Sequence, residues 1–213
     1  MIKLIINADD FGYSPVFNEK ILDLLERGVI KSTTVMVNRL YKTQERQIKR
    51  LIALEKAGRI GVGLHIEFPS GLPTEEDMDN QYKKFKEIFG FNPSHIDLHK
   101  RISDESFVKT VSEFAKSKGL PVRNHGFKTK AKMTTHPAFY NPTWVLYLSE
   151  CKDFLEKAKD GESCEIITHP GEYDPDSKSK VNEIRQNNYY VLLLLDKWLK
   201  QQKNIKVISY KEL

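Results

Sequence analysis

Short apolar runs alternate with longer amphipathic segments from one end of the chain to the other. The apolar runs predict strands at 3–7, 32–38, 59–68, 94–99, 120–125, 164–169 and 205–209. Helices are expected at 15–28, up to about residue 56, up to about residue 90, and at 104–118, 143–160 and 178–202. Nearly continuous apolar strands that alternate with helices predict an α/β fold, with a parallel sheet of about seven strands covered by helices.

The sequence marks both ends of the first predicted helix. Ser14 is a suitable N-cap, Pro15 suits the first turn, and Gly28 ends the apolar stripe. The chain has no linker rich in Gly, Pro or Ser and no internal repeat, so we expect a single domain over 1–213. The alternation by itself allows two closures of the sheet: an open doubly wound sheet, or a barrel that lacks an eighth strand.

Composition and charge narrow the function classes. The chain has 213 residues, 39% of them hydrophobic and 30% charged, which is ordinary for a globular protein. Its net charge of +5 arises from 34 basic residues spread among 29 acidic ones, and even the lysine-rich stretch 125–136 is typical of a solvated loop. We therefore expect no nucleic-acid partner. Two cysteines without a motif, no signal peptide and no apolar stretch long enough to span a bilayer predict a cytoplasmic protein without a membrane partner.

Polar side chains collect at the carboxyl ends of the predicted strands. Because these ends converge on one face in parallel α/β folds, we expect the side chains to share one site. The set comprises Asp9, Asp10, Asn38, His65, Asp97, His99, Arg123 and His169. Each member alone has a structural explanation, as a helix cap, a hydrogen-bonded core histidine or an ion-pair partner; the functional interpretation depends on the whole set.

Imidazoles beside carboxylates are typical ligands of a divalent cation, with zinc favoured by nitrogen ligands and magnesium by oxygen ligands. Of the adjacent carboxylates Asp9 and Asp10, one can bind the cation while the other accepts a proton from water. His169 is suited to protonate a leaving group. The residues predict metal-assisted hydrolysis of an amide or ester.

Six motifs resemble those of one family. NADDFG, STTVMVN, GLH, HIDLH, LPVR and HPGEYD stand here in the same order as in the YdjC-like carbohydrate deacetylases, which include the chitooligosaccharide deacetylases, and they span essentially the whole chain. The resemblance implies a distorted (β/α) barrel like that of polysaccharide deacetylases. It also implies metal-dependent removal of acetyl groups from a small N-acetylated carbohydrate substrate, and a homodimer.

Position by position, the resemblance assigns the roles. It makes Asp10, His65 and His99 the ligands of one divalent metal ion, Mg or Zn. Asp9 matches the general base, Arg123 the residue that orients that base, and His169 the general acid. The family pattern HxDSHxH is altered here to HIDLHKR, with Leu98 in place of the serine and Arg101 in place of the last histidine. Aromatic side chains near the strand ends are candidates for sugar contact, with simple packing as the alternative for each: Phe11, Phe68, Phe139, Tyr140, Trp144 and Tyr173.

Two other functions remain open from the residues. Another barrel metallohydrolase would share the metal, but a phosphoesterase usually gathers more carboxylates for a second cation, and the HxE…PCxxC signature of a zinc deaminase is absent from the sequence. A non-catalytic sugar-binding protein would have no need of a base and an acid around a cation.

Overall fold

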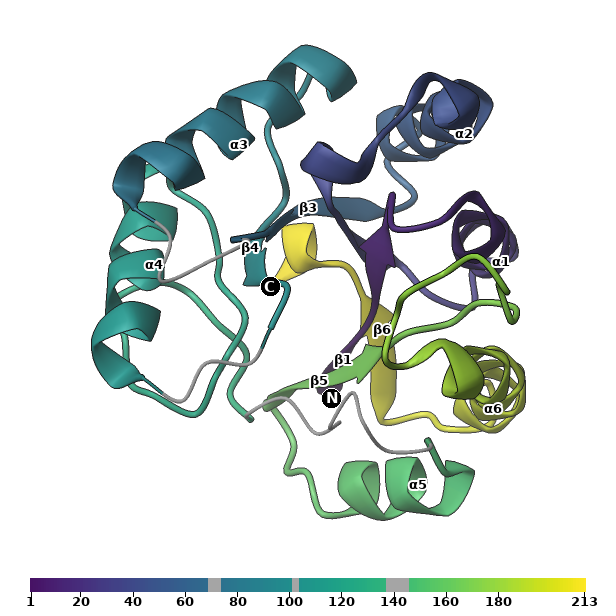
Figure 1. The fold of residues 1–213 in the computed structure, drawn as a ribbon. Coiled ribbons are helices and arrows are strands. Elements are labelled where there is room, and N and C mark those ends of the chain that lie inside the picture. Colours follow the sequence, from purple (N-terminus) through teal and green to yellow (C-terminus); the bar gives the residue numbers. More distant parts are fainter. Residues whose placement is uncertain (69–73, 101–103, 137–145) are drawn as a thin grey trace.

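A ring of parallel strands with helices on its outside forms the molecule (Figure 1). The structure, a computed structural model, describes residues 1–68, 74–100, 104–136 and 146–213. The strands in these residues are β1 (Ile2–Phe11), β2 (Ser32–Val35), β3 (Gly61–Ile66), β4 (Ile96–Leu98), β5 (Ser163–Thr168) and β6 (Ile205–Ile208). Their order is β4-β3-β2-β1-β5, with β6 also paired to β1, and every pairing is parallel.

Helices follow the strands and cover the outer face of the sheet (Figure 1). They are α1 (Pro15–Glu26), α2 (Glu45–Lys56), α3 (Glu75–Phe89), α4 (Glu105–Ser117), α5 (Leu148–Glu156) and α6 (Arg185–Leu199). Four short 3-10 turns accompany them: η1 (Val37–Arg39), η2 (Lys42–Gln44), η3 (Asn182–Ile184) and η4 (Tyr210–Glu212). The predicted start of the first helix is confirmed, since the Ser14 side chain accepts a hydrogen bond from the Val16 backbone and Pro15 occupies the first turn. No helix in the part of the chain that the structure describes is long and apolar enough to cross a membrane.

Strand β1 is the centre of the sheet and pairs with three neighbours. Residues 3–8 pair with β5. Residues 2–5 pair with β6, whereas residues 7, 8 and 11 pair with β2. Because a strand has two edges, β6 and β2 share one edge of β1, one along each half.

The expected distorted α/β barrel is confirmed, but the described residues hold six strands rather than about seven. The prediction of a strand at 120–125 was wrong: this segment makes one isolated bridge, Val122 to Ile96. Pro121 lacks the N–H that a ladder requires. Instead, the segment 121–136 spans the gap between β4 and β5, because the Arg123 N–H donates to the Ile96 carbonyl and the His136 N–H to the Ser163 carbonyl.

Three predicted elements differ from the structure by four residues or more at an end. β1 continues past residue 7, through both aspartates, to Phe11. α6 begins at Arg185 rather than at 178, because Asp174 and Asn182 exchange backbone and side-chain hydrogen bonds and hold the preceding residues as a loop. The helix expected at 143–160 is found at Leu148–Glu156, and residues 143–145 lie outside the described part of the chain.

Alternation along β1 separates two environments. Leu4, Ile6 and Ala8 lie in the main core between the sheet and the helices. Ile5 instead belongs to a small cluster with Ile208 and Tyr210. The C-terminal end of the chain lies inside the ring of strands (Figure 1). Because Tyr210 belongs to this end, the small cluster lies on the inner side of β1.

Candidate active site

Asp9 and Asp10 face the same space because β1 is bulged at this point. Neighbouring side chains of a regular strand point to opposite faces. Here the pairing register of β1 with β2 shifts between Ala8 and Phe11, and Asp10 has a φ of 70°, in the left-handed region. His65 Nε2 consequently lies 3.3 Å from Asp10 Oδ1 and 3.9 Å from Asp9 Oδ2. The bulge therefore lets two consecutive carboxylates enter one site.

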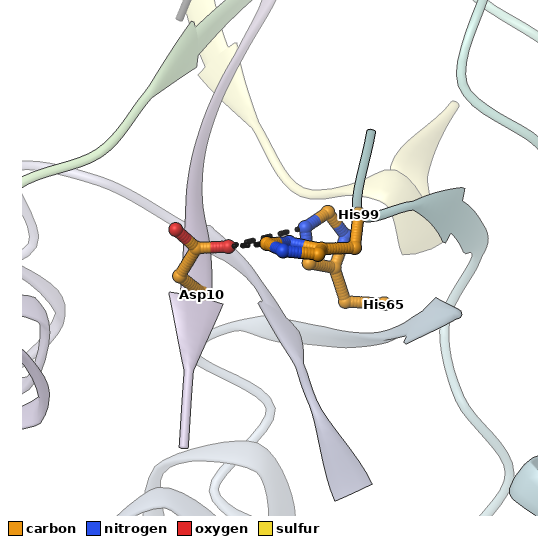
Figure 2. Close-up of side chains that lie close together, drawn as sticks. All are labelled: Asp10, His65 and His99. Carbon is orange, nitrogen blue, oxygen red and sulfur yellow. Dashed lines mark hydrogen bonds and ion pairs between the residues drawn. The ribbon is translucent and has the colours of Figure 1, made fainter. Parts of the chain in front are cut away.

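Asp10, His65 and His99 meet in a cluster with the spacing of metal ligands (Figure 2). Asp10 Oδ1 lies 3.3 Å from His65 Nε2 and 3.2 Å from His99 Nδ1. The three residues come from β1, β3 and the position just after β4. His65 and Asp10 are buried, whereas the His99 side chain is 18% exposed, so the cluster is reached from the His99 side. One carboxylate oxygen and two imidazole nitrogens suit a divalent transition metal or zinc.

His65 is oriented by a second carboxylate. Its Nδ1 lies 3.0 Å from Asp97 Oδ2, which leaves Nε2 facing Asp10. Burial lowers the pKa of His65, but Asp97, Asp10 and Asp9 outweigh this effect and raise it to about 10. A histidine held by a carboxylate on one ring nitrogen and directed at a cation with the other is a common arrangement in metal sites.

Arg185 is a site residue that the sequence reasoning missed. It is fully buried, its Nη2 donates to Asp10 Oδ2 at 2.6 Å, and its guanidinium lies 3.9 Å above the Phe17 ring. Arg185 is the first residue of α6, where a positive charge opposes the helix dipole. The sequence carried no signal of this role, because the helix predicted from residue 178 places Arg185 in its interior rather than at its start.

Asp9 is held by Arg123. The guanidinium donates from Nη1 to Oδ2 at 2.8 Å and from Nη2 to Oδ1 at 2.7 Å, while Asn7 Nδ2 donates to Oδ1 at 2.7 Å. Burial raises the pKa of Asp9, but Arg123 outweighs burial and lowers it well below its usual range. Asp9 is therefore an ionised carboxylate that keeps its position by a bidentate ion pair.

His169 also lies close to Asp9. Its Nε2 is 3.8 Å from Asp9 Oδ2, and its backbone N–H donates to Asn188 Oδ1 at 3.0 Å. Burial lowers the pKa of His169 to about 4, against the opposing effect of Asp10 and Asp9, so its imidazole is neutral at neutral pH.

A second cluster, Asp9, His65 and Asp97, also has ligand spacing among the described residues. It shares His65 with the first cluster, and Arg123 already contacts both of its carboxylates, reaching Asp97 Oδ2 at 2.5 Å. Because Arg123 already pairs with both carboxylates of this second cluster, the geometry favours a single ion held by Asp10, His65 and His99.

The aromatic candidates for sugar contact differ in burial. Phe11 is fully buried in the main core, so the structure does not bring it to the site. Phe68 is partly buried against Phe107, with ring centroids 5.5 Å apart, and Tyr173 is 53% exposed. Leu98 points into the main core, which explains why an apolar side chain is tolerated there. The remaining candidates, Phe139, Tyr140, Trp144 and Arg101, lie outside the described residues.

Comparisons with known sequences point to one family. The family model described as YdjC-like protein matches residues 3–79 and 73–202. A carbohydrate deacetylase of Clostridium beijerinckii is 28% identical, with 100% of each chain covered. A chitooligosaccharide deacetylase of Proteus mirabilis is also 28% identical, over 80% of this chain and 82% of that protein.

Solved structures share the fold. A protein of Enterococcus faecalis V583, named as a candidate for cellobiose-phosphate cleavage, has a TM-score of 0.79 at 20% identity, covering 99% of this chain and 98% of that one. A family 4 acetyl xylan esterase from Clostridium thermocellum, solved with a cobalt ion, has a TM-score of 0.63 at 13% identity and covers 99% and 89%.

Proposed function

This chain belongs to the YdjC-like protein family, and from that premise we propose that it is a metal-dependent carbohydrate deacetylase. Its reaction is hydrolysis of the N-acetyl group of an N-acetylated sugar or oligosaccharide, with release of acetate. The relatives named carbohydrate deacetylase and chitooligosaccharide deacetylase support the reaction class. The geometry of this chain's own carboxylates and histidines supports the mechanism.

One divalent ion fits the cluster of Asp10, His65 and His99. The donor set is one carboxylate oxygen and two imidazole nitrogens, and the second nitrogen of His65 is held by Asp97. When bound, such an ion supplies Lewis-acid polarisation of the acetamide carbonyl and lowers the pKa of the attacking water. Two imidazoles favour zinc, while magnesium is the alternative that the sequence leaves open.

Asp9 is placed to act as the general base. It is ionised, it lies beside the metal ligands, and Arg123 prevents it from rotating away. It accepts a proton from the water that attacks the acetamide carbon. Arg123 thus orients the base, and Asp9 remains distinct from the ligand Asp10 because the guanidinium occupies both of its oxygens.

His169 is placed to act as the general acid. Its Nε2 lies 3.8 Å from Asp9 Oδ2, so a proton taken from water by Asp9 has a short path to the imidazole. His169 then donates that proton to the departing sugar nitrogen as the C–N bond breaks. One water is consumed, and the products are acetate and a free amine.

The single observation that carries this proposal is the approach of Asp10 Oδ1 to both His65 Nε2 and His99 Nδ1, with Asp9 and His169 alongside. The arrangement favours an amide or ester hydrolase over a two-metal phosphoesterase, because Arg123 already pairs with both carboxylates of the second cluster. Tyr173 and Phe68 are the described aromatic side chains that remain candidates for sugar contact. The homodimer and the cytoplasmic location remain predictions.

Acetate release tests the proposal. The protein is stripped with a chelator, reloaded with Zn or Mg, and incubated with N-acetylglucosamine oligomers or with a phosphate monoester. We expect acetate from the oligomers only after reloading, and no phosphate. Absence of acetate with every divalent ion, or release of phosphate alone, would refute the proposed reaction.

A further inference from the structure

A buried chain of side chains runs from the general base to the C-terminal end of the protein. Arg123 donates from Nε to Glu165 Oε1 at 2.9 Å, on the edge of the guanidinium that Asp9 does not use. The Tyr210 hydroxyl donates to the other oxygen, Glu165 Oε2, at 2.6 Å. Glu165 is fully buried, and Tyr210 is 1% exposed.

Tyr210 is itself held in a fixed place. Its ring stacks on the His95 ring, with centroids 3.7 Å apart and an angle of 13° between the planes. His95 in turn lies against Gly63 of β3, where an added Cβ would stand 2.3 Å from His95 Cε1. Burial lowers the pKa of His95 to about 3, so the stacked ring is neutral. The absence of a side chain at Gly63 therefore makes room for the stack that locates Tyr210.

The charges in this region need such an arrangement. One guanidinium, Arg123, faces the carboxylates of Asp9, Asp97 and Glu165, and all four side chains are 4% exposed or less. Buried carboxyl oxygens are tolerated only when they receive hydrogen bonds or ion pairs. Tyr210 donates a hydrogen bond to Glu165 Oε2. This bond fixes the carboxyl group so that its other oxygen, Oε1, faces Arg123.

We propose that Tyr210, through Glu165, positions Arg123 and thereby the general base Asp9. This inference rests on the proposed function, because it assigns Asp9 the role of base. Tyr210 is a positioning residue: its hydroxyl contacts Glu165, and it acts on Asp9 through two intermediate side chains. The 3-10 turn η4, which carries it, is thus part of the active-site support rather than only a plug inside the barrel.

The substitution Tyr210→Phe tests this role, because it removes the hydroxyl and keeps the ring, its stack on His95 and its apolar contacts. We expect kcat to fall about tenfold, since a misplacement of about 1 Å can cost up to about 10²-fold in rate. KM and the dissociation constant of the metal are expected to stay within about twofold, since Asp10, His65 and His99 are untouched. Wild-type kcat in a folded Tyr210→Phe protein would overturn the proposal, because a purely packing role predicts that result.

Tyr189→Phe is the matched control. Its hydroxyl also donates to a carboxylate, Asp23 Oδ2 at 2.8 Å, but this pair joins α6 to α1 outside the barrel. We expect all three constants to be those of the wild type. A comparable fall of kcat in Tyr189→Phe would show that loss of any such hydrogen bond lowers turnover, and would overturn a specific role for Tyr210.

A double-mutant cycle tests whether Tyr210 acts through Glu165. In a Glu165→Ala background, Tyr210→Phe should have no further effect on kcat. An undiminished effect in that background would overturn the proposed route. Should Tyr210→Phe fail to fold, Glu165→Ala takes its place, because it removes the side chain through which Tyr210 acts; wild-type turnover in a folded Glu165→Ala protein would then refute the link.

Hydrogen exchange separates this inference from the proposed function. The Arg123 Nε–H, observed by nitrogen-15 NMR without substrate or metal, should exchange slowly in the wild type and faster in Tyr210→Phe. A wild-type protein that releases no acetate overturns the proposed function. Unchanged Nε–H exchange in Tyr210→Phe overturns the positioning role, whatever the activity.

Discussion

Arg185 Nη2 donates a hydrogen bond to Oδ2 of Asp10 at 2.6 Å, and both side chains are buried. This contact occupies one carboxylate oxygen and leaves Oδ1 toward His65 and His99. The orientation of the proposed metal ligand thus depends on a residue 175 positions away in the sequence.

Replacement of Arg185 by Met should weaken metal binding. Met keeps an apolar contact with Phe17 but removes the donor that orients Asp10, and loss of such a supporting group typically costs about 10–100-fold in metal affinity. Titration calorimetry with zinc measures the change. Arg50→Met is the control, because Arg50 binds Glu19 and Glu26 on the outer surface. Unchanged or tighter binding by Arg185→Met would contradict the orienting role.

The left-handed backbone at Asp10 should distinguish two substitutions. Asn tolerates a φ of 70° far better than a β-branched residue does. Metal-free Asp10→Val is therefore expected to have a free energy of unfolding about 1–3 kcal/mol below that of Asp10→Asn. Urea unfolding measures the difference. Lys206, exposed in the regular strand β6, is the control position: there the Val variant should be more stable than the Asn variant, because Val suits strands better than Asn. If the Asn variant is the more stable one at both positions, the difference at Asp10 does not arise from backbone strain.

Stability should depend on pH through Glu165. Burial raises its pKa to about 7, against the opposing effect of Arg123, from a usual value near 4.5. Between these two values Glu165 binds more protons in the folded protein than in the unfolded chain, so its own contribution to the free energy of unfolding falls as pH rises from about 4.5 to 7. The lowered pKa values of His95 and His169 act in the opposite direction over part of this range. The loss from this group is on the order of 3 kcal/mol, since one pKa unit corresponds to about 1.4 kcal/mol.

Urea unfolding of the metal-free protein at several pH values measures this effect. The free energy of unfolding of wild type minus that of Glu165→Gln should fall between pH 5 and 7, whereas the same difference for Glu87→Gln, at an exposed position of α3, should stay constant. A constant difference for Glu165→Gln would contradict the role of Glu165 in the pH dependence.

Metal binding should stabilise the fold. An ion that binds only the folded protein raises the free energy of unfolding by about 2.7 kcal/mol at 100 times its dissociation constant. We expect zinc to raise the melting temperature of the wild type. It should leave the melting temperature of His99→Ala unchanged. His136→Ala is the control, since His136 pairs with Glu162 away from the site. An equal increase in His99→Ala would exclude His99 as a ligand.

The sequence predicted the parts of the fold that follow from periodicity. Apolar runs located β1, β3 and β5, and the convergence of parallel strand ends brought Asp10, His65 and His99 together as expected. The segment 120–125 was misjudged because an apolar run looks the same whether it forms a ladder or a single bridge. Only tertiary contacts decide between these two states.

Long-range support of the site was beyond the sequence. The bulge at Asp10 depends on a register shift against β2, which local residues do not encode. Arg185, Glu165 and Tyr210 carry no motif; their roles arise from hydrogen bonds between elements distant along the chain. Phe11 was a candidate for sugar contact because it lies near a strand end, with simple packing as the alternative, and the structure places its side chain in the core.

The most direct test compares Asp9→Asn with Asp10→Asn. Each purified protein is loaded with zinc, its metal content is measured by plasma mass spectrometry, and acetate release from N-acetylglucosamine oligomers is followed. We expect Asp9→Asn to retain one ion per chain and lose turnover by about 10²–10⁴-fold, the usual cost of removing a proton-transfer group. Asp10→Asn should lose both. An Asp9→Asn protein that turns over like the wild type, or an Asp10→Asn protein that keeps its ion, would contradict the division of roles between the two aspartates.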